Sequence, residues 1–556
     1  MRTVPAIRVS HEAHDAVSDE PDGTDVVLVG YQDQGNLGMG YLAACLRAHG
    51  FTVELCEVRD GPDRVADVVA RARPAVVGFS LIFQFFLPQF RRVAAHLRQA
   101  GIRSHLTMGG HYPSLCHEDA LREFPELDSV VRYEGELTLV DLVGRLRAGE
   151  DWHEVPGIAY LDGGAVRESA TRSLVQDLDS LPFPHRPYAP EKILGFPTLP
   201  VLASRGCARR CSFCSIHTFY RTAPGKVVRV RKPEQVILEM LELNRDHGVR
   251  VFLFQDDDFP LWGRAGRRWV EELIERMREA ELVDHAIWKI SCRAEYLDGE
   301  LFAALRDAGL FLVYMGIESG VDAGLEILHK QMTVEQNRAG VRVLKELGLM
   351  FSYGFMLFDP SSTFASVREN VGFLREIVGD GAAAATFCRM LPYGGTPIRQ
   401  RLLDEGRLRG DITHPDYEFL DPRLDEYYRS LHAAARPWLD GGGLSHELNW
   451  AREELEVARR LVGELRGVDA YARAITALTA ESNAQLFGLV EDSSRAFEDE
   501  QDSSLLDAAE ASATCDQIRA RLLDLRNAFV FGNAEVLVAE VDAGAIRGPV
   551  GAPQVH

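Results

Sequence analysis

The chain has 556 residues, 46% of them hydrophobic, and a formal net charge of −22 at pH 7. This length exceeds what one hydrophobic core supports, so we expect two to four globular domains. An acidic chain without a basic stripe is a poor partner for nucleic acid, whose phosphates attract lysine and arginine.

The lack of an expected targeting signal and the usage of cysteine favour a reducing compartment. No stretch approaches the ~20 apolar residues of a membrane span. Residues 1–24 are polar and acidic, so we expect a loose tail and no secretory signal. Nine cysteines, an odd number, are scattered along the chain. This usage is typical of free thiols, and we expect a cytoplasmic location and no membrane partner.

Residues 25–150 alternate buried strands with amphipathic helices. Strands are expected over 25–30, 51–58, 75–80, 103–108 and 130–132, and helices over 39–49 and 89–100. Such alternation predicts a doubly wound, Rossmann-like α/β domain whose ligands sit at the carboxyl ends of its strands.

A hairpin near 157–167 and a proline-rich connector make up residues 151–198, and the alternation then resumes over residues 199–400. Strands are expected over 200–204, 250–255, 286–292, 311–317, 351–357 and 384–390. Six βα units are too few for a closed eight-stranded barrel, so we expect an open (β/α)6 partial TIM barrel.

After about residue 400 the sequence no longer shows the pattern of strands. Apolar residues at 3.6-residue spacing predict a helical C-terminal domain over residues 401–540. The acidic, serine-rich stretch 491–507 is expected to form an exposed loop between helices. Residues 541–556 are rich in glycine and proline, which predicts a flexible tail.

Three closely spaced thiols, Cys207, Cys211 and Cys214, follow the first expected barrel strand. Three thiolates can hold three corners of a [4Fe–4S] cluster and leave one iron open to bind and reduce a ligand. A structural zinc site needs four closed ligands, and His217 follows too soon for the usual zinc spacing. The pattern favours a redox cluster over zinc or plain buried thiols. The remaining cysteines are most simply small buried hydrophobic residues: Cys45, Cys56, Cys116, Cys292, Cys388 and Cys515.

This spacing, with the aromatic Phe213 before the last cysteine, resembles the radical S-adenosylmethionine (SAM) superfamily. In that family SAM chelates the open iron, and its reductive cleavage gives a 5′-deoxyadenosyl radical that abstracts hydrogen from unactivated carbon. The resemblance implies that the three cysteines are the cluster ligands and that Phe213 lies near the adenine.

Polar residues and a glycine close the next expected strands: Asp256, Asp257, Arg293, Gly316 and Glu318. The resemblance places the aspartates at the SAM ribose or amine and Arg293 near the methionine carboxylate. It also implies that Gly316 lets the backbone approach SAM and that Glu318 points at it. The alternatives are a helix N-cap for the aspartates, a surface cation for Arg293 and a structural ion pair for Glu318.

Four segments of the N-terminal domain, in order, resemble the cobalamin-binding radical SAM subfamily. They are Gly38–Gly50, Pro74–Ser80, Gly109–Pro113 and Tyr133–Glu136. The resemblance covers about residues 25–400 and implies a cobalamin-binding domain ahead of the barrel. Its implied cofactor contacts are Gly35, Asn36, Leu37, Gly38, Ser80, Leu81, Ile82, Phe83, Gly109, Gly110, His111, Glu134 and Glu136. A loop polar group for His111, and solvated turn residues for Glu134 and Glu136, are the plainer interpretations.

In one respect the sequence differs from classical cobalamin-binding methyltransferase domains: it lacks the histidine that would bind the lower face of cobalt. Classical methyltransferase domains use Asp-x-His-x-x-Gly to place an imidazole there, and the loop from Tyr31 to Gly38 contains no histidine. We therefore expect cobalamin without a histidine ligand on its lower face. The nearest residues should be Leu81, Ile82, Phe83 and Gln84, and this largely apolar face would disfavour six-coordinate cobalt.

Taken together, the resemblance implies a cobalamin-dependent radical SAM C-methyltransferase with a [4Fe–4S] cluster, SAM and cobalamin as cofactors. The expected substrate is a small natural-product intermediate between the two α/β domains, capped by the helical C-terminal domain. The expected electron donor is an external one-electron reductant of the flavodoxin or ferredoxin type. Ring formation or contraction would use the same cofactors. A regulator without turnover, and an N-terminal domain that binds no cobalamin, are the other readings.

Overall fold

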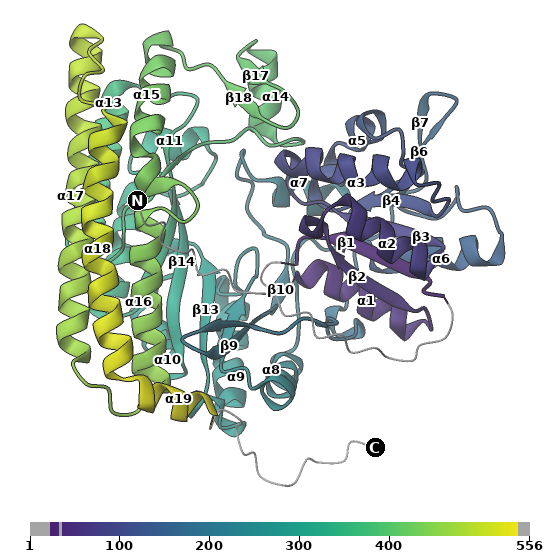
Figure 1. The fold of residues 1–556 in the computed structure, drawn as a ribbon, viewed down its shortest axis with the longest axis horizontal. Coiled ribbons are helices and arrows are strands. Elements are labelled where there is room, and N and C mark those ends of the chain that lie inside the picture. Colours follow the sequence, from purple (N-terminus) through teal and green to yellow (C-terminus); the bar gives the residue numbers. More distant parts are fainter. Residues whose placement is uncertain (1–22, 33–35, 543–556) are drawn as a thin grey trace.

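The computed structural model describes residues 23–32 and 36–542, which fall into three parts. In Figure 1 the N-terminal domain lies on the right, a curled sheet occupies the middle and long helices stand on the left. The middle sheet therefore lies between the other two parts.

The N-terminal domain is built on a seven-stranded sheet of order β2-β1-β3-β4-β5-β6-β7. Its parallel strands are β1 (Val26–Gly30), β2 (Val53–Glu57), β3 (Val76–Ser80), β4 (His105–Gly109) and β5 (Ser129–Val131). The hairpin β6 (Ile158–Asp162) and β7 (Ala165–Glu168) continues the sheet antiparallel to β5. The expected hairpin is thus an extension of the first sheet.

Helices cover both faces of this sheet, as a doubly wound fold requires. The helices are α1 (Leu37–Ala48), α2 (Pro62–Ala72), α3 (Leu87–Gln99), α4 (His111–Leu115), α5 (His117–Glu123) and α6 (Glu136–Ala148). Alternate residues of β1 enter different cores: Val27 packs with the core beneath α2 and α3, and Leu28 with the core beneath α1 and α6. This alternation follows from the two-residue period of a strand.

The second sheet is the curled partial barrel, of order β16-β15-β14-β13-β12-β9-β8. Its strands are β8 (Glu191–Ile193), β9 (Phe196–Val201), β12 (Val251–Phe254), β13 (Ile287–Cys292), β14 (Leu310–Glu318), β15 (Met350–Phe358) and β16 (Cys388–Arg389). All pairs are parallel except β8 with β9, so the open (β/α)6 arrangement is confirmed, with one antiparallel strand added.

Two barrel strands differ from the expectation. β9 begins four residues early, at Phe196 rather than residue 200, because it pairs with β8 inside the expected connector. β16 is shorter than expected because Ala384 and Ala385 donate their backbone N–H groups to the side chains of Asn449 and Asn483, at 3.0 and 2.7 Å. Bundle helices, not a neighbouring strand, satisfy this backbone.

The helices of the barrel region are α7 (Ser215–Thr222), α8 (Pro233–His247), α9 (Gly263–Glu279), α10 (Gly299–Asp307), α11 (Asp322–Ile327), α12 (Val334–Glu346), α13 (Phe364–Val378) and α14 (Pro397–Asp404). Two small antiparallel pairs lie outside the main sheets: β10 (Ser204–Arg205) with β11 (Arg229–Val230), and β17 (Leu408–Gly410) with β18 (Pro415–Tyr417). The helix between β9 and β12 begins at Pro233 and ends before Gly248, as expected.

The C-terminal part is helical: α15 (Pro422–Leu439), α16 (Leu444–Leu461), α17 (Val468–Glu500), α18 (Ala508–Gly532) and α19 (Ala534–Asp542). Helix α17 packs along α13 of the barrel, while α16 contacts β13, β14 and β15 (Figure 1). Within the described ranges, no helix has the length and apolar character needed to cross a membrane.

The expected loop over 491–507 is wrong for most of its length, because α17 runs on to Glu500. Ser493 and Ser494 are fully buried, and their hydroxyls donate to the backbone carbonyls of Leu489 and Glu491 within the same helix. Phe497 is buried as well. These contacts show that the serines face the bundle; only the short segment that follows α17 is a loop.

Candidate active site

The three motif cysteines lie together in the segment between β10 and α7. Cys211 is buried, and Cys207 and Cys214 are half-buried. Burial raises the pKa of Cys207 to about 12 and that of Cys214 to about 11, so a positive metal centre is needed to hold these groups as thiolates. Among the described residues, no three His, Cys, Asp or Glu side chains converge on a point as one metal ion requires. Cysteines that ligate a [4Fe–4S] cluster each bind a different iron and need no such convergence, so the loop is compatible with a cluster.

Adjacent aspartates support this loop from the end of β12. Asp257 accepts a hydrogen bond from the backbone N–H of Gly206 at 2.9 Å, and Asp256 accepts from that of Ala203 at 3.2 Å. Burial raises the pKa of Asp256 to about 7 and that of Asp257 to about 6. Both carboxyls therefore brace the chain just before the first cysteine.

Asp258, which we did not select from the sequence, is the carboxyl nearest the cysteines. Its Oδ2 lies 3.8 Å from the Sγ of Cys207, and its buried Oδ1 has no hydrogen-bond partner within the described part of the chain. A buried oxygen without a partner is costly unless a ligand supplies one. The signal was available, because Asp258 belongs to the same acidic run.

Arg293 and Glu318 lie below the cysteine loop in a buried charge network. Arg293 donates to the backbone carbonyl of Lys330 at 2.5 Å and pairs with Glu295 at 3.0 Å, so it is no surface cation. Glu318 pairs with the Nζ of Lys330 at 2.9 Å. The structural ion pair named as the alternative for Glu318 is thus present, and Lys330 was not identified from the sequence because no motif surrounds it.

Local backbone geometry explains the residues around that ion pair. Glu318 has a φ of 64°, in the left-handed region that non-glycine residues adopt at an energetic penalty and that often marks functional sites. A Cβ on Gly316 would lie 2.5 Å from a carboxylate oxygen of Glu318 and 2.6 Å from the Nζ of Lys330. A side chain at position 316 would therefore displace this ion pair. Phe213 is half-buried against the barrel core.

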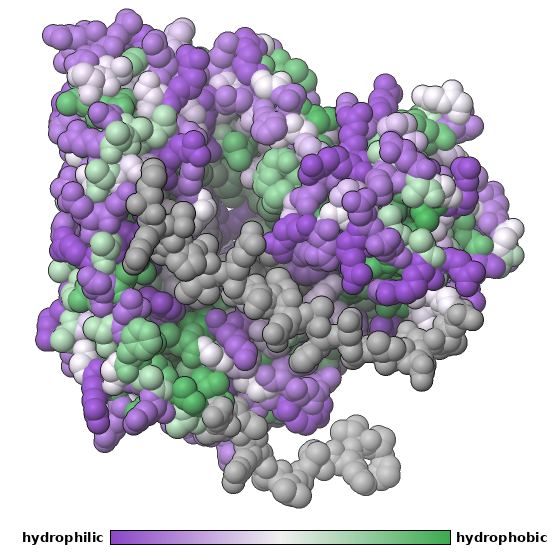
Figure 2. Space-filling view, viewed as in Figure 1, coloured by the Kyte–Doolittle hydropathy of each residue, from purple (hydrophilic) through white to green (hydrophobic). Residues whose placement is uncertain are grey.

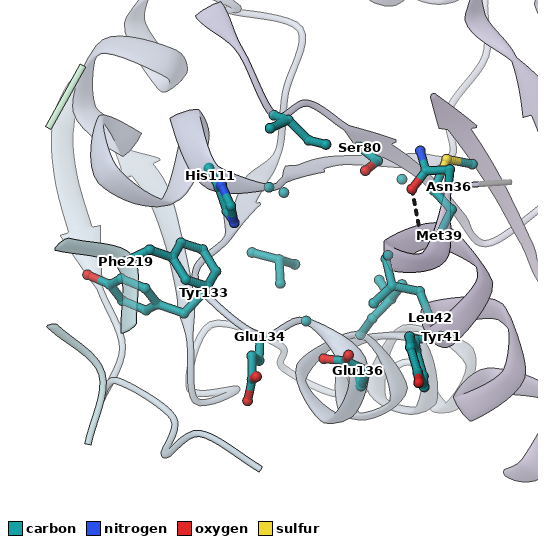
Figure 3. A pocket seen from close by; sticks show the side chains of 18 of the residues that line it. Asn36, Met39, Tyr41, Leu42, Ser80, His111, Tyr133, Glu134, Glu136 and Phe219 are labelled. Carbon is teal, nitrogen blue, oxygen red and sulfur yellow. Dashed lines mark hydrogen bonds between the residues drawn. The ribbon is translucent and has the colours of Figure 1, made fainter. Parts of the chain in front are cut away.

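A cavity lies at the carboxyl ends of β1, β3 and β4, where residues of the barrel loops also line it (Figure 3). It encloses about 1200 Å³ of empty space, part of it open to solvent. Its deep end is an apolar slot between the sheet and helices α1 and α6, lined by Leu28, Leu42, Gly78 and Leu139.

Glycines and a neutral imidazole shape the mouth of the cavity. Gly110 has a φ of 113°, and a Cβ there would lie 2.1 Å from the carbonyl oxygen of Leu81. His111 lies beside Phe219, with ring centroids 4.5 Å apart. Burial lowers the pKa of His111 to about 4, so its ring is neutral at pH 7 and can donate or accept a hydrogen bond.

Most residues expected around cobalamin line this cavity. They are Asn36, Gly38, Ser80, Ile82, Gly109, Gly110, His111, Glu134 and Glu136, several of them labelled in Figure 3. Asn36 also caps α1, its Oδ1 accepting from the backbone N–H of Met39 at 3.1 Å. Gly35 lies outside the described residues.

Four expected residues are not among those that line the cavity. Leu37 and Leu81 are buried, Leu81 in the core beneath α2 and α3. Phe83 faces the barrel instead, with its ring centroid 5.5 Å from that of Tyr393. Gln84 also turns toward the barrel, where its Oε1 accepts from the backbone N–H of Gly394 at 2.6 Å. Of the apolar loop expected below cobalt, Ile82 is the residue that borders the cavity.

Glu134 and Glu136 join the two domains. Arg205 of β10 pairs with Glu134 at 3.2 Å and with Glu136 at 2.7 Å, and Arg229 of β11 pairs with Glu134 at 2.8 Å. All four side chains are at most 10% exposed, so the solvated-turn interpretation is wrong. The sequence did not reveal these arginines, because neither lies in a recognised segment.

Aromatic residues complete the wall of the cavity, and two cysteine assignments need correction. Tyr41, Tyr133, Phe219 and Tyr220 line the cavity from both domains. Cys45, Cys56, Cys292 and Cys515 are buried as expected. Cys388, however, is exposed on β16, and Cys116 is half-buried. Cys388 differs because its side chain lies on the hollow inner side of the barrel.

Comparison with known proteins agrees with this division. Residues 23–143 match the model of the B12 binding domain, and residues 201–374 match that of the Radical SAM superfamily. An uncharacterized methyltransferase of Pyrococcus horikoshii is 30% identical over 368 residues, covering 65% of this chain and 77% of that protein. An anaerobic magnesium-protoporphyrin IX monomethyl ester cyclase of Cereibacter sphaeroides is 26% identical over 400 residues, covering 69% of this chain and 62% of that protein.

Among solved structures, the cobalamin-dependent SAM radical enzyme OxsB with aqua-cobalamin bound has the same fold. The TM-score is 0.66 at 18% identity, over 94% of this chain and 84% of that one. The chain belongs to the cobalamin-binding radical SAM family. Its cofactors are a [4Fe–4S] cluster, SAM and cobalamin.

Proposed function

We propose that the protein is a C-methyltransferase that moves a methyl group from SAM to a carbon atom of a small molecule. The cluster, SAM and cobalamin together supply one-electron cleavage of SAM and carriage of the methyl group. The methyltransferase of Pyrococcus horikoshii, 30% identical over most of its length, supports methyl transfer over other reactions of the family.

The observation that carries the proposal is the shared wall between the two cofactor sites. Asp257 lines the cobalamin cavity, and the same carboxyl holds the backbone of Gly206 next to Cys207 at 2.9 Å. A substrate held at this wall would reach both reactive centres, which removes the entropic penalty of bringing three groups together.

The chain's own residues would bind and orient the groups. Cys207, Cys211 and Cys214 would hold the cluster, and the free Oδ1 of Asp258 would accept a hydrogen bond from a SAM donor group. The slot between the sheet and helices α1 and α6 would hold the cobalamin tail. Electrons would come from an external reductant of the flavodoxin or ferredoxin type.

The test uses SAM with a trideuteriomethyl group. The protein is purified anaerobically, loaded with cluster and cobalamin, and incubated with reductant and a metabolite extract of cells that carry the gene. Methyl transfer predicts a product heavier by one labelled methyl group, with S-adenosylhomocysteine and 5′-deoxyadenosine both formed in a substrate-dependent manner.

The rival reaction gives a different outcome. Cyclisation or rearrangement, as the 26%-identical cyclase suggests, would yield 5′-deoxyadenosine without labelled product or S-adenosylhomocysteine. A non-catalytic regulator would form neither compound. Either result would overturn methyl transfer while leaving the cofactor assignments in place.

A further inference from the structure

The inner face of the barrel is hollow and carries large side chains that reach open space. Tyr314, on the central strand β14, is 39% exposed, and Leu391, just beyond β16, is 40% exposed. Core residues of a central strand are normally covered on both faces. Figure 2 shows the molecule hollowed between the barrel and the N-terminal domain. We call the space on the inner side of β13–β16 the barrel chamber.

The floor of the chamber carries a lysine on β13. Trp288 and Ile290 are fully buried on the outer side of the sheet, so the alternation of a strand turns Lys289 inward. Its Nζ donates to the hydroxyl of Ser291 at 3.2 Å and lies 5.7 Å from the ring centroid of Tyr314. In the described part of the chain, no carboxylate oxygen lies within 4.0 Å of this ammonium.

The acidic group that interacts with Lys289 is a glutamate of the C-terminal helices. Helix α16 contacts β13, β14 and β15, and its Glu453 is the acidic group that acts most strongly on Lys289. Glu453 likewise has no cation of the described residues within 4.0 Å. The adjacent Glu454, by contrast, is held by Arg526 at 2.6 Å.

These two groups are therefore close enough to interact but too far apart to neutralise each other directly. Both residues are half-buried, and burial raises the pKa of Glu453 to about 7 and lowers that of Lys289. Separated charges in such surroundings are costly unless a partner pairs with both. A bound molecule with one group of each sign would pair with both.

We propose that Lys289 and Glu453 bind a zwitterionic group of the substrate, with a carboxylate toward Lys289 and an ammonium toward Glu453. Tyr314, the exposed Cys388 and Leu391, and the half-buried Tyr393 contact its apolar body. The inference rests on the proposed function, because it assigns a binding site to the small-molecule substrate of that reaction.

The test compares three small probes with one aromatic body: phenylalanine, phenethylamine and 3-phenylpropionate. Their binding to the SAM-loaded holoenzyme is measured by saturation-transfer NMR for wild type, K289M and E453Q. Wild type should bind phenylalanine about tenfold more tightly than either single-charge probe, as expected for one charge-assisted hydrogen bond more. K289M should bind phenylalanine no better than phenethylamine, which lacks the carboxylate. E453Q should bind phenylalanine no better than 3-phenylpropionate, which lacks the ammonium.

The matched controls K345M and E376Q remove charges from surface ion pairs and should leave all three affinities unchanged. Cluster absorbance must match wild type in every variant. Equal or absent binding of the three probes, or a preference that both variants retain, would overturn the inference. Because binding needs no turnover, failure of methyl transfer with intact probe binding would remove the proposed function alone.

Discussion

The cysteine triad permits the sharpest prediction at the scale of single residues. Each thiolate would ligate a different iron, so replacing Cys207, Cys211 or Cys214 by serine should abolish the cluster. Iron content and visible absorbance after anaerobic reconstitution measure this loss. Cys515→Ala, a buried thiol in α18, should retain full iron content. A complete cluster in any of the three serine variants would contradict the assignment.

Glu453 makes stability depend on pH. Burial raises its pKa from 4.5 to about 7 in the folded protein, so between these values the folded state keeps a proton that the unfolded state has lost. The contribution of Glu453 to the free energy of unfolding therefore falls as pH rises through this window. E453Q removes the titration, so its stability relative to wild type should rise by about 1–3 kcal/mol between pH 5 and pH 8.

The thermal unfolding midpoint of the two proteins, measured at several pH values, checks this sign. The surface variant E376Q serves as the control, because its carboxylate pairs with Arg338 at 48% exposure. A difference between E453Q and wild type that stays constant with pH would show that Glu453 is not held in the barrel chamber.

At the scale of elements, the turn after β4 has no room for a side chain. Gly110→Ala would place a Cβ 2.1 Å from the carbonyl oxygen of Leu81, at a φ of 113°. The turn must shift, which we expect to destabilise the domain by about 2 kcal/mol or more and to weaken cobalamin binding at least tenfold. Spectroscopic titration with hydroxocobalamin measures the binding. Gly101→Ala, at a φ of 81° but in open space, separates backbone strain from the clash.

Element patterns predicted much of the fold but failed where a distant partner decides the structure. Strand and helix periods are local, which is why β1 and the helix from Pro233 were recovered. Ser493 and Ser494 look like loop residues until the bundle buries them. The backbone at Ala384 looks like a strand until Asn449 binds it. In each case the decisive contact lies far away in sequence.

The candidate site divides in the same way. The cysteine spacing and the acidic run were visible because chemistry fixes short spacings. Lys330, Arg205 and Glu453 were not, because each is a single charged residue outside any motif, and the sequence does not show which residue it meets. A period of 3.6 identifies the apolar face of α16 but not the sheet that it meets.

At the scale of the molecule, the barrel chamber exists only if the N-terminal domain, the partial barrel and the C-terminal helices keep fixed positions. The bundle supplies Glu453 to the floor through α16, and the N-terminal domain covers the opposite end with the cobalamin cavity. Closing the barrel therefore depends on two interfaces. The interface with the N-terminal domain combines the apolar cluster around Tyr133 and Phe219 with the buried charges of Arg205, Arg229, Glu134 and Glu136.

Arg205→Met should loosen that interface. The variant leaves Glu136 without its partner and removes the guanidinium that lies 4.6 Å from the ring centroid of Tyr41. An uncompensated buried carboxylate costs about 3–5 kcal/mol, so we expect a lower unfolding midpoint and faster proteolysis of the connector over residues 168–190. R91M, which breaks an exposed pair with Glu123, should change either value little.

A compensating variant distinguishes charge from shape at this interface. Replacing Glu134 and Glu136 by glutamine in the R205M background removes the buried charge and should restore part of the lost stability, since neutral amides are cheaper to bury than unpaired carboxylates. Unchanged proteolysis in R205M would show that apolar contacts such as those of Tyr133 and Phe219 hold the domains together. Restored stability in the triple variant would show that the unpaired buried charge, and not a change of shape, destabilises R205M.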